Sequence, residues 1–206
     1  PDTLDPALNS SVDGAIMCQH LFSGLAKWAP DANMNYVKIE ADAAAKIKGN
    51  LKTGEYKDLA DADLVVEAIL ETMDAKKGLF SQLDDICKAE TIFATNTSSL
   101  SVTEIARGIK HDVIGMHFFN PANVMKLVEV ICGVNTPAAV KDKIVEVSKN
   151  LGKTPVEVNE GPGFVVNRIL VPMINEAACI LQEGIASAED IDTAMKLCAN
   201  HPMGPL

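Results

Sequence analysis

Apolar runs of strand length alternate with amphipathic helical patterns from about residue 60 onward, and this alternation constrains the fold more than any other feature. Helical spacing is clearest over residues 74–88 and 137–150, and it is also present over residues 15–28 and 42–48. Strands that alternate with helices are typical of an α/β layer around a mostly parallel sheet. The expected strands are residues 63–69, 91–95, 113–118, 127–131 and 155–158.

Polar residues mark where two of the expected helices begin. Ser101 and Glu104 have the spacing of a capping box, which predicts a short helix after the second strand. Thr136 precedes Pro137, and this pair fits an N-cap followed by proline at the first helical position. Both signals place helices between strands, as an α/β layer requires.

The sequence changes character at residues 161–163, where Gly-Pro-Gly interrupts the alternation. A helix is expected over residues 164–183, with a kink at Pro172. Ser187 is expected to cap a second helix over residues 188–199. The expected domains are residues 1–160, an α/β domain, and residues 161–206, the start of an all-helical domain.

The net charge and the cysteines argue against several classes of protein. With a net charge of −10, the chain lacks the basic face that sequence-independent nucleic-acid binding requires. A few lysines and backbone amides still suffice for a small polyanionic ligand. The five cysteines are widely separated and form no C-x-x-C pair. This pattern argues against a disulfide framework or a zinc site and favours a reducing compartment, here the cytoplasm.

No membrane or secretory segment is expected. Residues 1–13 are polar and acidic and lack the basic start of a signal peptide. The longest apolar stretch, residues 163–181, contains Arg168 and Glu176. A buried helix therefore fits this stretch better than a membrane span.

Polar residues also follow two of the expected strands. Residues 96–99, Asn-Thr-Ser-Ser, lie at the strand end where open parallel sheets bind ligands, but the same residues commonly form a turn and a helix cap. Taken alone, the turn is the better interpretation. His117 also lies near a strand end. A single strand histidine is commonly structural, although the Phe118-Phe119-Asn120-Pro121 segment after it is consistent with the mouth of a pocket.

Two further polar residues interrupt apolar patterns. Glu129 shares one face of its strand with Leu127 and Ile131, so it either faces inward with His117 as its partner or lies on an edge strand and faces solvent. A buried carboxylate without a partner would cost several kcal/mol. Asn167 lies near the start of an apolar helix and fits either a polar patch or a ligand-binding residue.

Four segments together carry a resemblance that none carries alone. They are NTSSLSVTEIA, GMHFFNPANVMKLVEV, GPGFVVNRILVPMINEA and EDIDTAMKLCANHPMGPL. In order and spacing they resemble the 3-hydroxyacyl-CoA dehydrogenase family, from about Lys46 to Leu206. The segment GIASAEDIDTAMKL is most similar to the family's bacterial 3-hydroxybutyryl-CoA members.

The resemblance implies a Rossmann-like NAD-binding domain over residues 1–160 and the start of a helical substrate and dimerisation domain over residues 161–206. It implies an oxidoreductase that uses NAD, or NADP, to interconvert short-chain 3-hydroxyacyl-CoA and 3-ketoacyl-CoA in fatty-acid or butanoate metabolism. The implied partners are an acyl-CoA substrate and, in full-length members, a second copy of the chain; neither nucleic acid nor a membrane is among them.

The resemblance also implies roles for individual residues. His117 would be the general acid/base, and Glu129 would orient its ring. Ser98 would hydrogen-bond the substrate oxygen near the nicotinamide, and Asn167 would help to hold the thioester end. The residues implied to contact the cofactor are Glu71, Lys76, Ser98 and Asn120. No metal is implied.

The chain departs from the family pattern at both ends. It contains no G-x-G-x-x-G turn for the pyrophosphate, and it stops at Leu206, where the family continues with further helices. We therefore expect a sheet that is incomplete in its N-terminal part, a truncated helical domain and weak NAD binding. The competing hypotheses are a non-catalytic remnant with weak CoA-thioester binding and a portion of a multifunctional fatty-acid oxidation protein.

Overall fold

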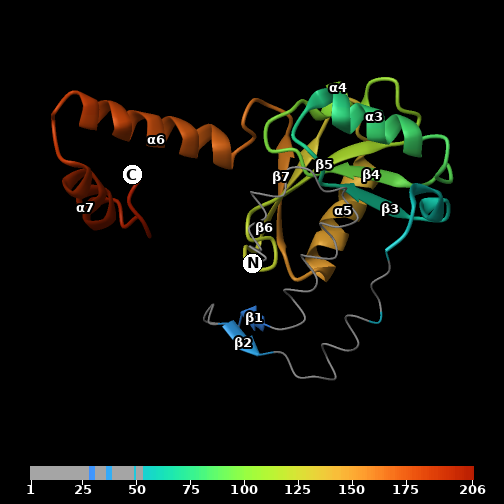
Figure 1. Ribbon diagram of the computed structural model, residues 1–206, viewed down its shortest axis with the longest axis horizontal. Helices are drawn as coiled ribbons and strands as arrows, with labels where there is room; N and C mark the ends of the chain where they lie inside the picture. Colours follow the sequence, from blue (N-terminus) through green and yellow to red (C-terminus); the bar gives the residue numbers. More distant parts are fainter. Residues whose placement is uncertain (1–27, 31–35, 39–48, 50–52) are drawn as a thin grey trace, which may run out of the picture. The chain divides into compact units, whose positions relative to one another are not determined.

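The computed structural model describes residues 28–30, 36–38, 49 and 53–206. The chain divides into two compact units, Pro1–Gly161 and Pro162–Leu206. The first unit contains a five-stranded sheet with helices on its faces, and the second contains two helices (Figure 1). The division lies within one residue of the boundary expected from the Gly-Pro-Gly segment.

The sheet of the first unit has the strand order β3-β4-β5-β6-β7. Its strands are β3 at Leu64–Glu67, β4 at Ile92–Thr95, β5 at Val113–Phe118, β6 at Leu127–Cys132 and β7 at Thr154–Asn159. The pairs β3–β4, β4–β5 and β6–β7 are parallel, and β5–β6 is antiparallel. The mostly parallel sheet and all five predicted strands are therefore confirmed. The one antiparallel pair needs no crossover helix, and a loop joins β5 to β6.

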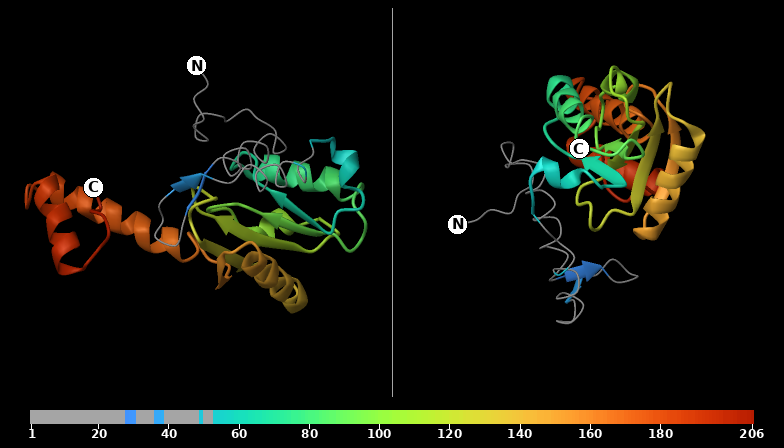
Figure 2. Two further views of the ribbon diagram at one scale, coloured as in Figure 1. Left: turned by 90° about the horizontal axis from the view of Figure 1, so that it is seen from below. Right: turned by 90° about the vertical axis from the view of Figure 1, so that its right-hand side faces the viewer.

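Helices cover both faces of this sheet. Helix α3 at Met73–Leu83 and helix α4 at Val102–Ala106 lie on one face, and α5 at Ala138–Asn150 lies on the other, as Figure 2 shows from two further directions. On the α5 side, Val140 and Ile144 pack against apolar residues of the central strands. Those strand residues are Ile92, Ala94, Ile114, Met116, Val128 and Val130. On the other face, the rings of Phe80 and Phe93 stack with their centroids 4.9 Å apart. The central strands of the sheet are thus buried on both faces, as is typical of a parallel sheet.

Gly115 in β5 permits the close approach of α4 to the sheet. A Cβ atom at this position would lie 2.8 Å from Cβ of Ile131 and 3.1 Å from Cγ2 of Val102. Both distances are shorter than ordinary van der Waals contact, so only glycine fits without a shift of its neighbours. The position matters because Gly115 lies two residues before His117 on the same face of the strand.

In the first unit, the end of α3 and the start of α5 differ from the predicted helix boundaries. Helix α3 ends at Leu83 rather than near residue 88, and turns follow it. The Asp84 carboxylate accepts hydrogen bonds from the backbone N–H groups of Lys110 and His111, which draws the chain toward the start of β5. The N-cap of α5 is Pro137 and not Thr136.

Thr136 instead joins two strands. Its hydroxyl group accepts a hydrogen bond from the Gly133 N–H at 3.0 Å and donates one to the Val113 carbonyl at 2.8 Å. It therefore ties the end of β6 to the start of β5. Of the capping box predicted at Ser101 and Glu104, the Ser101 cap is present, because its hydroxyl accepts a hydrogen bond from the Glu104 N–H. The Glu104 carboxylate instead pairs with Lys77 at 3.0 Å.

Two short strands and a 3-10 helix precede the sheet along the chain. Strand β1 at Trp28–Pro30 pairs antiparallel with β2 at Tyr36–Lys38, and the 3-10 helix η2 spans Tyr56–Leu59. Trp28 is therefore in a strand and not at the end of a helix. The remainder of the helical spacing predicted over residues 15–28 and 42–48 lies outside the described residues.

The second unit consists of α6 at Val166–Gln182 and α7 at Ala188–Cys198. Ser187 caps α7 as predicted, since its hydroxyl accepts a hydrogen bond from the Asp190 N–H. Helix α6 continues through Pro172 and begins two residues later than predicted. The reason is that Gly163 and Phe164 both have positive φ, 74° and 52°, which is incompatible with a right-handed helix. Among residues 53–206, no helix is long and apolar enough to cross a membrane.

Candidate active site

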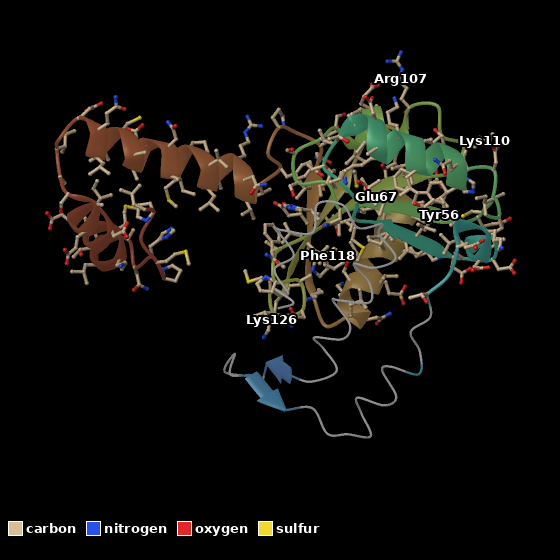
Figure 3. The ribbon with its side chains drawn as sticks, in the orientation of Figure 1. Tyr56, Glu67, Arg107, Lys110, Phe118 and Lys126 are labelled. Atoms are coloured by element: carbon tan, nitrogen blue, oxygen red, sulfur yellow. The ribbon has the colours of Figure 1, made fainter. Side chains whose placement is uncertain are left out.

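Three neighbouring parallel strands of the first unit end in polar residues. Glu67 is the last residue of β3, Asn96 follows β4, and His117 is the last residue but one of β5. The Asn96 N–H donates to the Glu67 carbonyl at 2.8 Å, and its side-chain oxygen accepts from the Phe118 N–H, also at 2.8 Å. Figure 3 labels Glu67 and Phe118, which mark two of these strand ends. Asn96 therefore holds all three ends together at the edge where open α/β sheets bind ligands.

His117 and Glu129 form a buried pair across the antiparallel strands. They are direct register partners on β5 and β6, and Nδ1 of His117 lies 2.8 Å from Oε2 of Glu129. Their side chains are only 5% and 1% exposed. The predicted inward-facing pair is therefore confirmed. The alternative of an edge-strand glutamate is wrong, because β6 lies between β5 and β7.

This pairing sets the chemistry of the imidazole ring. A carboxylate can only accept, so Nδ1 carries the proton and donates to Glu129. In the neutral ring, Nε2 is then the basic nitrogen, and a proton added there gives an imidazolium whose charge the carboxylate offsets. The Phe119 ring lies against the imidazole, with the centroids 4.5 Å apart, and limits its rotation.

The turn after β4 is organised by a carboxylate from another element. Oε1 of Glu71 accepts hydrogen bonds from the Thr97 hydroxyl at 2.6 Å, the Ser98 N–H at 2.7 Å and the Ser99 N–H at 3.1 Å. Burial raises the pKa of Glu71, but the hydrogen bonds from Thr97 and Ser98 and the charge of Lys76 outweigh it, so the pKa lies below its ordinary value. Glu71 therefore stays ionised and keeps Ser98 in a fixed turn.

Lys76 connects Glu71 to the interior. Its side chain is 1% exposed, and its ammonium group lies 2.7 Å from Oε1 of Glu67 and 3.2 Å from Oε2 of Glu71. The Glu67 side chain is 0% exposed, and its Oε2 accepts a hydrogen bond from the Thr95 hydroxyl at 2.7 Å. The carboxylates of Glu67 and Glu71 therefore both contact the buried Lys76 ammonium, and Glu71 also binds the Ser98 turn.

Asn120 lies at the start of the loop that joins β5 to β6, and it is exposed. Lys153, which directly precedes β7, contacts this loop. Its ammonium group donates hydrogen bonds to the carbonyls of Ala122 and, at 2.8 Å, of Met125. Burial lowers the pKa of Lys153. Lys153 therefore holds two main-chain oxygens of the loop that also contains Asn120.

Asn167 belongs to the second unit and is the second residue of α6, half-buried.

In the first unit, the structure brings His117 with Glu129, and Ser98 with Glu71 and Lys76, to one edge of the sheet. Within the residues that the structure describes, no group of three or more histidine, cysteine, aspartate or glutamate side chains is arranged to hold a metal ion.

Comparison with known proteins accounts for both units. Residues 19–161 match the family model described as 3-hydroxyacyl-CoA dehydrogenase, NAD binding domain, and residues 163–206 match the model of the C-terminal domain of the same family. The chain belongs to the 3-hydroxyacyl-CoA dehydrogenase family. The resemblance inferred from the four motifs is therefore confirmed. The family match begins at residue 19, so it includes a region that the motifs left unassigned.

Individual family members show how far this likeness extends. A 3-hydroxybutyryl-CoA dehydrogenase of Clostridioides difficile is 60% identical over 156 residues, which are 75% of this chain and 56% of that protein. The mitochondrial hydroxyacyl-coenzyme A dehydrogenase of Homo sapiens is 52% identical over 145 residues, 69% of this chain and 46% of that protein. The crystal structure of (S)-3-hydroxybutyryl-CoA dehydrogenase from Ralstonia eutropha superposes with a TM-score of 0.78 at 42% identity, covering 93% of this chain and 65% of that one.

The Rossmann-like fold expected for this family member is confirmed by these neighbours. The chain spans between about half and three-fifths of the length of three curated relatives that it matches.

The motifs of the 3-hydroxyacyl-CoA dehydrogenase family did not single out Glu67. The sequence nevertheless carries a signal for it, because Glu67 interrupts the apolar run of the first predicted strand as Glu129 interrupts the fourth. Lys76 likewise falls on the helical face formed by Leu79, Phe80 and Leu83, where a charge needs a partner. Each of these two charges in an apolar pattern indicates that a buried partner exists.

Proposed function

We propose that this chain forms the catalytic part of an enzyme that interconverts a short-chain 3-hydroxyacyl-CoA and the corresponding 3-ketoacyl-CoA with NAD or NADP. The observation that carries the proposal is the buried His117–Glu129 pair at the carboxyl edge of the sheet, in a chain of this family. A buried imidazole backed by a carboxylate is suited to moving one proton at neutral pH.

The residues at this edge fit the nicotinamide end of such a cofactor. Glu71 offers an ionised carboxylate that can accept hydrogen bonds from ribose hydroxyl groups, and Ser98 and Asn120 offer a hydroxyl and an amide. Lys76 would contribute through Glu71, because its own ammonium is buried. Of the four cofactor-binding residues that the resemblance implies, Glu71, Ser98 and Asn120 would contact the cofactor in this proposal, and Lys76 would hold Glu71 in place. NAD or NADP, when bound, supplies the hydride acceptor for C3 of the hydroxyacyl group.

The chain supplies the proton transfer. In the oxidation direction, Nε2 of His117 takes the proton of the 3-hydroxyl group as the C3–H bond breaks, and the C3–O bond becomes a carbonyl. Glu129 offsets the positive charge that the ring then carries. In the reverse direction the imidazolium returns the proton to the carbonyl oxygen. Ser98 would donate a hydrogen bond to the same oxygen, and its position follows from the Glu71 contacts.

The remaining assignments rest on the family alone. Asn167 would hold the thioester end of the substrate, and a second copy of the chain would complete the assembly. The acyl chain would be short, the setting would be fatty-acid or butanoate metabolism, and the compartment would be the cytoplasm. Support for the short acyl chain comes from the 3-hydroxybutyryl-CoA dehydrogenase of Clostridioides difficile, at 60% identity.

The test is oxidation of NADH by acetoacetyl-CoA, followed by absorbance, with NADH raised until the rate no longer increases. Saturating NADH is needed because the sequence has no G-x-G-x-x-G turn, and we expect the chain alone to bind NADH more weakly than low micromolar. His117→Ala should lower turnover by about 10²–10⁴-fold, with a smaller change in acyl-CoA binding. No turnover by the unaltered chain at any NADH concentration would favour the non-catalytic remnant. The same assay with NADPH in place of NADH shows which of the two cofactors the chain uses.

A further inference from the structure

The Glu67 carboxylate is fully engaged inside the protein, although it holds no place in the proposed reaction. Oε1 accepts hydrogen bonds from the Ile69 N–H and from the Lys76 ammonium, each at 2.7 Å. Oε2 accepts one from the Thr95 hydroxyl at 2.7 Å. These contacts join the end of β3 to α3 and to the end of β4. Because all these contacts hold the Glu67 carboxylate in one position, they also fix the position of the Lys76 ammonium that binds it.

The partner, Lys76, passes this constraint on to Glu71. Its ammonium group lies 3.2 Å from Oε2 of Glu71, and Oε1 of the same carboxylate receives the N–H groups of Ser98 and Ser99. Glu71 itself is partly exposed, with 37% of its side chain open to solvent. An exposed glutamate has several rotamers available, and Lys76 favours the one that faces the turn, together with the hydrogen bonds that Oε1 accepts there.

We infer that Glu67 is a positioning residue for the Ser98 turn, acting through Lys76 and Glu71. The inference rests on the proposed function, since it gives the buried pair a role in placing the hydroxyl that would meet the substrate oxygen. The ordinary alternative is a pair that only stabilises the fold. In that case, an uncharged replacement of similar size would leave the turn and the reaction unchanged.

The double variant Glu67→Gln/Lys76→Met separates these two roles. The introduced glutamine keeps an acceptor for the Ile69 N–H, and the introduced methionine has nearly the length of lysine but no charge, so no buried ion is left unpaired. The only group that loses a charged partner is Glu71. The variant should therefore fold, which thermal unfolding followed by circular dichroism would check.

Two readouts then report the position of the turn. Hydrogen exchange measured by NMR should be about 10-fold or more faster at the Ser98 and Ser99 amides, because their acceptor is no longer fixed by a charged hydrogen bond. In the acetoacetyl-CoA assay at saturating NADH, kcat should fall by about 10-fold, while KM for acetoacetyl-CoA changes by less than about threefold. If the Glu67–Lys76 pair only stabilised the fold, neither the exchange rates of these amides nor kcat would change.

Asp84→Asn is the matched control. Asp84 and His111 form another buried acid–base pair in the same unit, 2.5 Å apart, beside the opposite ends of the strands. This variant should lower the stability and leave kcat and the Ser98 exchange rate unchanged. If the double variant fails to fold, Glu67→Gln alone, which leaves Lys76 paired with Glu71, should speed the exchange in the same direction by a smaller factor.

The possible outcomes distinguish the positioning role of Glu67 from the proposed reaction. An active wild-type chain with unchanged Ser98 exchange and unchanged kcat in the variant would overturn the positioning role and leave the proposed reaction standing. Faster exchange in the variant, with a wild-type chain that never oxidises NADH, would support the link from Glu67 to the turn and overturn the proposed reaction.

Discussion

Replacing Glu129 by glutamine tests the central pair most directly. Glutamine has nearly the same shape, and its side-chain carbonyl can still accept the hydrogen bond from Nδ1 of His117. The change therefore removes the negative charge and keeps the contact that orients the ring. Because the Glu129 side chain is 1% exposed, water cannot replace the carboxylate in stabilising the positive charge of the imidazolium. The variant thus isolates how much the carboxylate stabilises the imidazolium.

The size of the effect follows from the geometry. At 2.8 Å and an effective dielectric constant of about 20, the attraction between imidazolium and carboxylate is about 6 kcal/mol. Desolvation offsets part of it, and a hydrogen bond to a charged group contributes about 2–3 kcal/mol net. At about 1.36 kcal/mol for each factor of ten, loss of the charge should lower kcat by about 30- to 160-fold. Substrate KM should change little, because the change removes a charge behind the imidazole and leaves the groups proposed to hold the acyl-CoA unaltered.

The assay is initial-rate oxidation of NADH with acetoacetyl-CoA, at saturating NADH. Glu157→Gln is the control. Glu157 lies on the neighbouring strand β7 and pairs with Lys141 at 2.8 Å, but it is 56% exposed. Such a surface pair contributes little, so this variant should keep the wild-type kcat. A kcat within about twofold of wild type for Glu129→Gln would refute the role given to the buried charge.

Three further predictions concern stability. Burial raises the pKa of Asp84, but hydrogen bonds from His111 and Lys110 outweigh it, so the pKa lies below its ordinary value of 3.8. The stability that Asp84 contributes is therefore present above pH 3.8 and lost as the pH falls further, so urea unfolding should show the difference between wild type and Asp84→Asn shrinking below about pH 4. Gly115→Ala should lower the free energy of unfolding by about 1–3 kcal/mol, because the added Cβ would meet Ile131 at 2.8 Å; an unchanged urea midpoint would contradict the close packing. Lys153→Met should cost about 1–2 kcal/mol and speed proteolysis in the loop after β5, since two main-chain oxygens lose their donor.

The central strands could be predicted because they are buried on both faces. A run such as residues 113–118 is apolar throughout except at His117, and β5 occupies those same residues in the structure. Helix ends were less predictable, because side chains that cap in one context make tertiary contacts in another. The Thr136 hydroxyl bonds to the Val113 carbonyl of a distant strand instead of capping α5. No local pattern shows that a competing acceptor lies 23 residues earlier in the chain.

Two buried carboxylates illustrate what a sequence can and cannot supply. Glu129 and its partner His117 lie on successive strands joined by a short loop, so alternation along each strand suffices to place them on one face. Glu67 and Lys76 are only nine residues apart, which is closer in sequence, yet their contact depends on how α3 lies on the sheet. Helix packing angles and translations are not fixed by periodicity, because several ridge-and-groove arrangements bury the same face. A charge in an apolar strand therefore predicts that a partner exists; the identity of the partner follows from the sequence only when strand register determines it.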